Sequence, residues 1–350
     1  MDSLIRADNE YKTWVESISS RYKKCQIKAA VKVNAEMLKF YYNLGKEIFE
    51  LKAESKWGTG FYQNLSYDLS VHLPNIKGFS VTNLKYMRRF YELFSDVESI
   101  RPQLADEFET ELIFTIPWGH IRNIIDKCGG DTQRALFYIK ETINNNWSRA
   151  VLLNFLDTNL YERQGKAVTN FEYRLPAEQS GLAQEMTKDP YNFDFLAIQK
   201  NYDEKELKDA LMDNIQKFLL ELGTGFAFVG REYRLSVENT DEYIDMLFYN
   251  IKLHCYVVIE IKITEFKPGD LGQLGTYIVG VNHLLKSDSD NDTIGLLICK
   301  TKSNVFAQWA LESSNQPIGI SEYQLDKLLP DEIQKSMPTI EDIENELNNI

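Results

Sequence analysis

The sequence has no long apolar run, no secretory leader and no paired-cysteine motif. No apolar stretch in its 350 residues approaches the roughly 18–20 residues that a membrane-spanning helix needs. The opening residues, MDSLIRADNEYK, lack the apolar centre of a signal peptide. The cysteines are scattered without C-x-x-C spacing, which argues against a disulfide framework or a zinc site: Cys25, Cys128, Cys255 and Cys299. We therefore expect a cytoplasmic protein with reduced cysteines and no membrane contact.

An excess of positive charge is also absent, since the formal net charge is −13. With 43% hydrophobic and 26% charged residues, the chain is typical of a globular protein long enough for two domains. The acidic balance argues against a protein that coats nucleic acid without discrimination. It does not exclude an enzyme that cuts nucleic acid, because local basic patches and metal ions can offset the repulsion of phosphates.

Strand-like alternation is scarce in residues 1–163, which predicts an all-α N-terminal domain. Its first element is a long helix from about residue 8 to residue 52, with an apolar stripe at three- and four-residue spacing: Ile27, Val31, Ala35, Leu38, Tyr42 and Phe49. The earlier half of this helix carries a basic cluster, with no acidic residue between Arg21 and Ala35: Arg21, Lys23, Lys24, Lys28 and Lys32. This basic face predicts either a contact with phosphates or an ordinary solvated surface.

A pair of helices joined by a short turn follows. Its second helix, residues 81–94, begins after Ser80, which suits an N-cap, and it carries three basic residues: Lys85, Arg88 and Arg89. The pattern is that of a helix-turn-helix and predicts that these three residues contact DNA. The alternative is a helical hairpin whose arginines only face solvent. More helices follow, with capping signals at Asp131 and Ser148.

Periodicity fades in residues 164–190, which we interpret as a connector with a short helix around residues 182–186. The second domain, residues 191–325, begins with a helix capped by Asp203 and Glu206 and carrying one apolar stripe up to Gly223. The pattern continues with three strands, a helix, a strand, a further helix and a short strand. Residues 326–350 form an acidic tail, expected to be a loosely docked helix or disordered.

The central hairpin, YIDMLFYNIKLHCYVVIEIKI at residues 243–263, carries charges where a strand should be buried: Asp245, Glu260 and Lys262. Alternate strand residues face the same side, so Glu260 and Lys262 point together. Buried charges need partners or a metal. A carboxylate on one strand and Glu-x-Lys on the next is typical of a metal-dependent phosphodiesterase site. The alternative is an exposed strand end with an ordinary Glu–Lys pair.

Several blocks of the sequence resemble the YhcG-type PD-(D/E)XK nuclease proteins, whose helical N-terminal region is winged-helix-like. The matching blocks span most of the chain: LSYDL, LPNIKGFSVTNLKYMRRFYELF, IPWGHI, NWSRAVLLNF, KDPYNFDFL, FLLELGTGFAFVGREYRL, YIDMLFYN, YVVIEIKI and IGLLICKTK. The resemblance implies a helix-turn-helix-like domain followed by a restriction-endonuclease-like α/β domain with an αβββαβ core. One departure is Glu232, where the family pattern has Gln.

Carried over to this sequence, the family pattern assigns a role to each residue of the site. The metal ligands would be Asp245, Glu260 and the backbone carbonyl of Ile261, and Lys262 would orient or deprotonate the attacking water. Gln273 and Tyr277 would form a Q-x-x-x-Y motif on the adjacent helix. The site would be completed by a helix glutamate.

Two glutamates are candidates for this position. We prefer Glu204 to Glu206, because it shares the sheet-facing side of Leu207. The alternative for either is a charge favoured at a helix N-terminus.

Hard carboxylate oxygens select Mg²⁺ or Mn²⁺. We therefore predict a Mg²⁺-dependent DNA endonuclease of repair, restriction or mobile-element defence, with no organic cofactor. By analogy with related nucleases, it could act as a homodimer. The competing hypothesis is a non-catalytic DNA-binding or scaffolding subunit of a restriction or defence complex.

Overall fold

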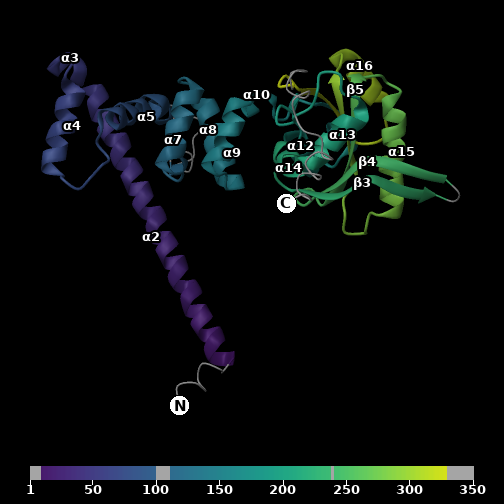
Figure 1. Cartoon of the computed structure of the whole chain (residues 1–350), viewed down its shortest axis with the longest axis horizontal. Coiled ribbons are helices and arrows are strands. Elements are labelled where there is room, and N and C mark those ends of the chain that lie inside the picture. The colour runs from purple at the N-terminus through teal and green to yellow at the C-terminus, as the bar shows by residue number, and fades with distance from the viewer. Residues whose placement is uncertain (1–8, 100–110, 238–239, 329–350) are drawn as a thin grey trace, which may run out of the picture. The chain divides into compact units, whose positions relative to one another are not determined.

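The computed structural model describes residues 9–99, 111–237 and 240–328, which fall into two compact units, Met1–Tyr161 and Glu162–Ile350 (Figure 1). Within the described residues, the first unit is helical and all seven strands belong to the second. The predicted order of a helical region followed by an α/β region is confirmed. None of the described helices is long and apolar enough to cross a membrane.

The described part of the first unit consists of helices. Their bounds are α2 Asn9–Glu50, α3 Ala53–Trp57, α4 Phe61–His72, α5 Val81–Ser99, α7 Trp118–Cys128, α8 Thr132–Asn145, α9 Arg149–Asp157 and α10 Leu160–Arg163. Three predicted N-caps are confirmed: Ser80 Oγ accepts from the Asn83 amide at 3.3 Å, Asp131 caps α8 and Ser148 caps α9. Local capping chemistry therefore sets where these helices begin.

Helix α5 lies at the centre of this unit, packed against α2, α4, α7 and α8. Its apolar face is buried at Leu84, Met87 and Tyr91. The approach of α2 to α5 is close, because a Cβ atom at Gly45 would overlap the carbonyl oxygen of Met87. The glycine therefore permits the two backbones to touch.

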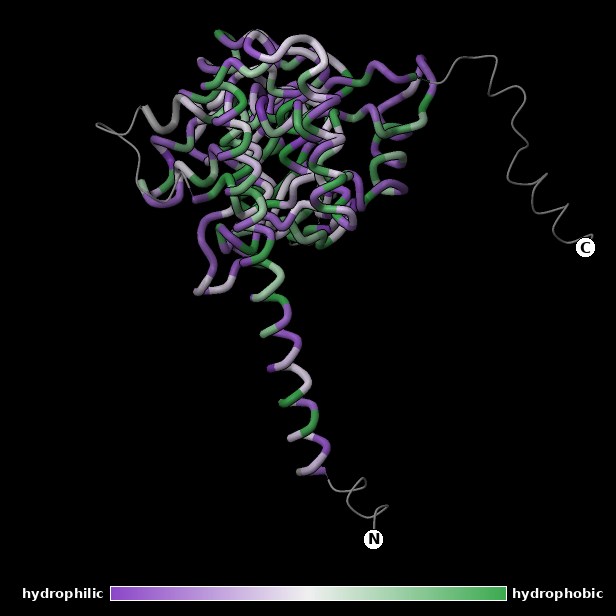
Figure 2. Tube along the Cα trace, turned by 90° about the vertical axis from the view of Figure 1, so that its left-hand side faces the viewer, coloured by the Kyte–Doolittle hydropathy of each residue, from purple (hydrophilic) through white to green (hydrophobic). Residues whose placement is uncertain are grey.

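The first half of α2 is not covered by the described residues of its unit. Every described side chain from residue 11 to residue 33 is exposed, and polar and apolar residues alternate along these turns (Figure 2). The predicted apolar stripe is therefore not buried along its whole length, since Ile27 and Val31 are 63% and 54% exposed and Phe49 is 45% exposed. The helical bundle covers α2 only from about residue 34 onward, and there Leu38 and Tyr42 are buried.

The second unit is built on a mixed sheet in the order β1-β7-β6-β5-β4-β3, with β2 pairing to β7. The strands are β1 Val168–Thr169, β2 Tyr191–Asn192, β3 Phe226–Val237, β4 Thr240–Asn250, β5 Cys255–Glu265, β6 Ile294–Thr301 and β7 Ile318–Gln324. Neighbouring strands from β3 to β5 are antiparallel, and those from β5 to β7 are parallel. The predicted central hairpin is therefore β4 and β5.

Helices cover both faces of this sheet. One face carries α13 Glu204–Asp213 and α14 Ile215–Leu222, and the other carries α15 Asp270–Leu284 and α16 Asn304–Ser313. The alternation of β5 serves both layers, since Val257 and Ile259 pack with α13 and α14 while Val258 packs with α15. This two-sided burial explains why β5 and β6 contain nearly continuous apolar runs.

The helix predicted from one apolar stripe is divided at Asn214. The Asn214 side-chain amide donates to the carbonyl of Ala210 at 3.0 Å, at the position where α13 ends and α14 begins. The predicted capping box at the start of α13 is confirmed, because Asp203 and Glu206 each accept from the other's backbone amide.

Residues 164–190 are ordered as part of the second unit. They form β1, α11 Phe171–Arg174 and α12 Ala177–Met186, and they bury Phe171 and Ala183. A buried ion pair joins Arg163, just before this segment, to Glu221, and a partly buried one joins Asp189 to Lys302. The segment we interpreted as a connector thus contributes to this unit's core. Of the predicted tail, only residues 326–328 lie within the described part of the chain.

Candidate active site

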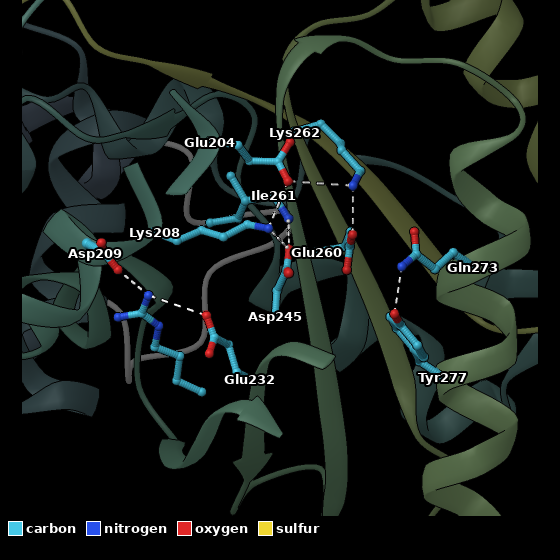
Figure 3. A network of polar contacts seen from close by, with 11 residues as sticks. Glu204, Lys208, Asp209, Glu232, Asp245, Glu260, Ile261, Lys262, Gln273 and Tyr277 are labelled. Atoms are coloured by element: carbon cyan, nitrogen blue, oxygen red, sulfur yellow. Dashed lines mark hydrogen bonds and ion pairs between the residues drawn. The ribbon is translucent and has the colours of Figure 1, made fainter. Parts of the chain in front are cut away.

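The predicted site residues of the second unit gather where α13 meets strands β4 and β5 (Figure 3). Regular β4–β5 pairing runs from Asn250–Cys255 to Met246–Ile259 and then stops. Beyond it, the Asp245 carboxylate accepts a hydrogen bond from the Ile261 amide at 3.3 Å. The Asp245 side chain therefore replaces a backbone acceptor of the strand pairing. This hydrogen bond holds it at the point where the two strands separate.

Glu260 is the most deeply buried of these acids, with 2% of its surface exposed. Its Oε1 atom accepts from Lys262 Nζ at 2.8 Å, whereas its buried Oε2 atom has no hydrogen-bond partner among the described residues. Burial raises the pKa of Glu260 to about 7, and the negative charge of Asp245 adds to this rise, while Lys262 and Lys208 oppose it. Such a carboxylate is poised to receive a second cation.

Lys262 lies between two carboxylates. Its Nζ atom is 2.8 Å from Glu260 Oε1 and 3.8 Å from Glu204 Oε1. Burial lowers the pKa of Lys262, but the surrounding carboxylates raise it more strongly, so the net shift is upward. The ammonium group is therefore held in its charged form.

Lys208 belongs to the same cluster, although we did not predict it as a site residue. Its Nζ atom lies 2.6 Å from Asp245 Oδ2 and 2.8 Å from Glu204 Oε1, and its side chain is 17% exposed. The signal was present in the sequence, because Lys208 follows Glu204 by four residues and so shares its side of the helix. Only the fold, however, brings Asp245 within reach.

Glu204 and Glu206 have different positions in the structure. Glu204, the preferred candidate, points into the cluster toward Lys208 and Lys262 (Figure 3). Glu206 instead accepts from the Asp203 backbone amide at 2.8 Å, on the exposed side of the helix N-terminus. The capping box therefore accounts for Glu206, and Glu204 is the helix glutamate close to the site.

Gln273 and Tyr277 lie on α15, beside Glu260 (Figure 3). Gln273 Nε2 donates to the Tyr277 hydroxyl at 2.6 Å, and Tyr277 is buried. Burial raises the pKa of Tyr277, and the charges of Glu260 and Asp245 contribute in the same direction. The two polar groups of the Q-x-x-x-Y motif thus form one unit that faces the carboxylates.

Glu232 lies opposite Asp245 in the β3–β4 register, since its neighbours Arg231 and Tyr233 pair with Met246 and Ile244. Its φ angle of 44° falls in the left-handed region, and its side chain is exposed. Arg231 forms an ion pair with Asp209 and lies 3.6 Å from Glu232. The departure from the family pattern therefore sits at the edge of the site.

The three basic residues of α5 each have a partner. Lys85 lies over the Tyr62 ring at 5.6 Å. Arg88 contacts Glu54 at 2.5 Å and Glu92 at 2.9 Å, and Arg89 contacts Asp126 at 2.7 Å: intramolecular carboxylates hold both guanidinium groups. These residues share a helix, as predicted, but the two arginines are neutralised by neighbouring acids.

Comparison with known proteins places both units of the chain. Residues 17–163 match the DUF1016 N-terminal domain, and residues 184–338 match the YhcG PDDEXK nuclease domain. The chain belongs to the YhcG-type PD-(D/E)XK family. It is 29% identical over 341 residues to the Escherichia coli K12 protein named "Putative nuclease YhcG", covering 89% of this chain and 90% of that one. The resemblance inferred from the sequence blocks is confirmed.

Two solved structures overlap parts of this family member. A repair endonuclease from Pyrococcus abyssi shares 15% identity with a TM-score of 0.24, over 37% of this chain and 49% of that one. An EndoMS–dsDNA complex shares 17% identity with a TM-score of 0.26, over 41% of this chain and 50% of that one. The chain thus spans about half the length of each of these two proteins.

Divalent metal ions are typical of PD-(D/E)XK nucleases. The residues of this site can therefore be compared with what such an ion requires of its ligands. Among the described residues, no three His, Cys, Asp or Glu side chains are grouped closely enough to hold a metal ion. Two carboxylates are nevertheless present, Asp245 and Glu260, and Glu260 Oε2 is a buried oxygen with no hydrogen-bond partner. Oxygen donors of this kind suit a hard cation, so the chemistry fits.

Proposed function

We propose that this family member is a metal-dependent DNA endonuclease whose second unit hydrolyses phosphodiester bonds. The supporting observation is that Asp245, Glu260 and Lys262 meet at the end of the β4–β5 pairing, where Glu260 Oε2 is buried and has no hydrogen-bond partner among the residues that the structure describes. A structural ion pair would not require this open acceptor, since leaving a buried oxygen unsatisfied is unfavourable. A role in DNA repair, restriction or mobile-element defence fits such an activity.

The proposal also covers the fold within each unit. We propose that α14, β3, β4, β5, α15 and β6 form the αβββαβ core expected of PD-(D/E)XK nucleases, and their order along the chain supports this. Helices α4 and α5 are the proposed helix-turn-helix, because a short turn at Gly78 joins them.

In the proposed site, Asp245, Glu260 and the Ile261 carbonyl would hold Mg²⁺ or Mn²⁺. When bound, the metal would lower the pKa of an attacking water and neutralise charge on the phosphate. Lys262 would orient this water as a charged donor. It is less suited to act as a base, because its carboxylate neighbours raise its pKa and keep it protonated. Glu204 completes the set, within 3.8 Å of Lys262.

The Gln273–Tyr277 pair would position groups beside the carboxylates. Gln273 Nε2 donates to the Tyr277 hydroxyl at 2.6 Å, and the amide oxygen of Gln273 points away from Tyr277 (Figure 3). An amide in this place can accept from the attacking water or donate to a phosphate oxygen after a small rotation. We assign Gln273 an orienting role.

For DNA contact we propose Lys85, Arg88 and Arg89 on α5, together with the basic residues of α2. Lys85 and Arg89 are exposed, which supports contact, although phosphates would have to displace the carboxylate partners of both arginines. On α2, five exposed cations have no carboxylate partner within the described residues: Arg21, Lys23, Lys24, Lys28 and Lys32. Four of these follow one another at three- or four-residue spacing, so they share one face.

A second candidate function is a non-catalytic DNA-binding or scaffolding subunit. It is favoured by the absence of a three-acid group among the described residues and by Lys208, which lies on Asp245 at 2.6 Å. A site that has lost metal binding would keep its carboxylates only as ion-pair partners. The two functions differ in whether Mg²⁺ produces cleavage.

The deciding experiment incubates the full-length protein with supercoiled plasmid in Mg²⁺, in Mn²⁺ and in EDTA. We expect nicking or linearisation only with metal. Asp245→Ala, Glu260→Ala and Lys262→Ala should each reduce the rate by about 100-fold or more while the protein stays folded. Glu206→Gln, which changes an acid outside the cluster, should cleave like the wild type. DNA binding without cleavage would favour the scaffolding role, and cleavage by all three variants would refute the site.

A further inference from the structure

Lys208 is the one cation of the cluster that the Glu-x-Lys motif does not explain. It reaches the site from α13 and contacts two acids at once, Asp245 at 2.6 Å and Glu204 at 2.8 Å. Its side chain is only 17% exposed, so the ammonium group has little access to water. The contacts to these two carboxylates therefore satisfy most of its hydrogen-bonding capacity.

Charges in the cluster are nearly balanced by the protein itself. Three carboxylates, Glu204, Asp245 and Glu260, are matched by two ammonium groups: Glu204 contacts both, Asp245 contacts Lys208 and Glu260 contacts Lys262. Lys208 binds Asp245 at Oδ2, the same oxygen that accepts from the Ile261 amide. A cation that binds this oxygen meets a positive charge already in place, and like charges repel strongly where water is scarce.

We propose that Lys208 is a resident counter-cation that competes with the divalent metal for Asp245. The inference rests on the proposed function, since it concerns the same site. When a metal binds, the Lys208 ammonium leaves Asp245 and keeps Glu204 as its partner. The exchange needs only rotation of the lysine side chain, because Glu204 is on the same helix four residues earlier. Metal binding then carries the cost of breaking the 2.6 Å contact, and the site is filled only when metal is abundant.

The test measures Mn²⁺ binding by titration calorimetry on the full-length protein without DNA. Lys208→Met removes the charge and keeps the length of the side chain. We expect it to bind Mn²⁺ about tenfold or more tightly than the wild type. Lys205→Met is the matched control, because Lys205 is an exposed lysine on the same helix. It changes the net charge equally and should bind within about twofold of the wild type.

Two further variants make every outcome informative. Asp245→Asn combined with Lys208→Met should not show the tighter Mn²⁺ binding expected of Lys208→Met alone, since the competition is for Asp245. Lys208→Gln replaces Lys208→Met if thermal melting shows that the latter is unfolded. Equal or weaker binding by both Lys208 variants, with clear binding by the wild type, would overturn this inference alone. Absence of Mn²⁺ binding in all of these proteins would overturn the proposed metal site with it.

Discussion

Among single residues, Glu260 carries the largest electrostatic consequence of the fold. Its carboxyl group is buried, and among the described residues only one of its two oxygens meets a cation. An acid in this position is easier to keep protonated than charged. The site therefore gains a strong cation acceptor at the expense of stability in the metal-free protein.

This conflict predicts a pH-dependent gain in stability from Glu260→Gln in EDTA. The pKa of Glu260 rises from its ordinary value of 4.5 to about 7 in the folded state. The folded protein thus holds a proton that the unfolded chain has released between these values, and wild-type stability falls as pH rises through this window. Relative to the variant, we expect the wild type to lose on the order of 3 kcal/mol between pH 4 and pH 8.

Urea unfolding at several pH values measures this difference. Glu206→Gln is the control, because it makes the same chemical change at an exposed cap and should follow the wild-type pH profile. Parallel profiles for wild type and Glu260→Gln would show that the Glu260 carboxyl is not destabilised by its burial.

At the scale of elements, the contact between α2 and α5 depends on one glycine. Gly45→Ala should destabilise the first unit by about 2 kcal/mol, because the added Cβ would overlap the Met87 carbonyl oxygen and force the helices apart. Thermal melting of the full-length protein measures the loss. Gly119→Ala on α7 is the control, since a Cβ there meets nothing within 4 Å, and it should leave the melting temperature unchanged or raised. Equal melting temperatures for both variants would mean that α2 and α5 are not packed this closely.

The role of α5 in DNA binding is testable against that of α2. If α5 enters a groove, Arg88→Ala combined with Arg89→Ala should weaken binding and flatten its salt dependence by roughly one unit of slope per lost contact. Lys24→Ala combined with Lys28→Ala makes the same charge change on α2, where the cations have no carboxylate partner among the described residues. Fluorescence anisotropy on duplex DNA across a salt series compares the two. An unchanged affinity of the α5 variant for DNA would mean that Arg88 and Arg89 serve packing and not DNA contact.

At the scale of the whole molecule, the exposed half of α2 is unusual for a chain with a net charge of −13, because it is both basic and apolar. Apolar side chains recur there at alternating four- and three-residue spacing, the pattern of a coiled coil: Tyr11, Val15, Ile18, Tyr22 and Cys25. Leaving this seam in water would be unfavourable, so a second copy of the chain is a natural partner.

We therefore predict a homodimer formed through α2. Ile18→Glu combined with Tyr22→Lys should convert it to a monomer without changing the melting of the helical bundle, since both side chains lie outside that bundle. Light scattering coupled to gel filtration gives the mass of each protein. A monomeric wild type at micromolar concentration would contradict the prediction.

The amino-acid sequence alone determined the elements and their local chemistry. Periodicity placed the long helix, the hairpin of β4 and β5 and the strand β6, and capping residues such as Asp131, Ser148 and Asp203 marked where helices begin. These features depend on neighbours within a few residues, so they can be predicted from short patterns. The family could be recognised from the sequence for a similar reason: its matching blocks are short patterns that coincide with these helices and strands.

Only the tertiary structure decided which charges meet. Lys208 contacts Asp245 across 37 positions of sequence, Arg89 contacts Asp126, and Ile27 stays exposed although its stripe continues to a buried face. None of these follows from spacing, because a side chain's partner is set by elements that arrive from elsewhere in the chain. Ion pairs are also weakly encoded, since many carboxylates and cations in a sequence could pair and only packing selects among them.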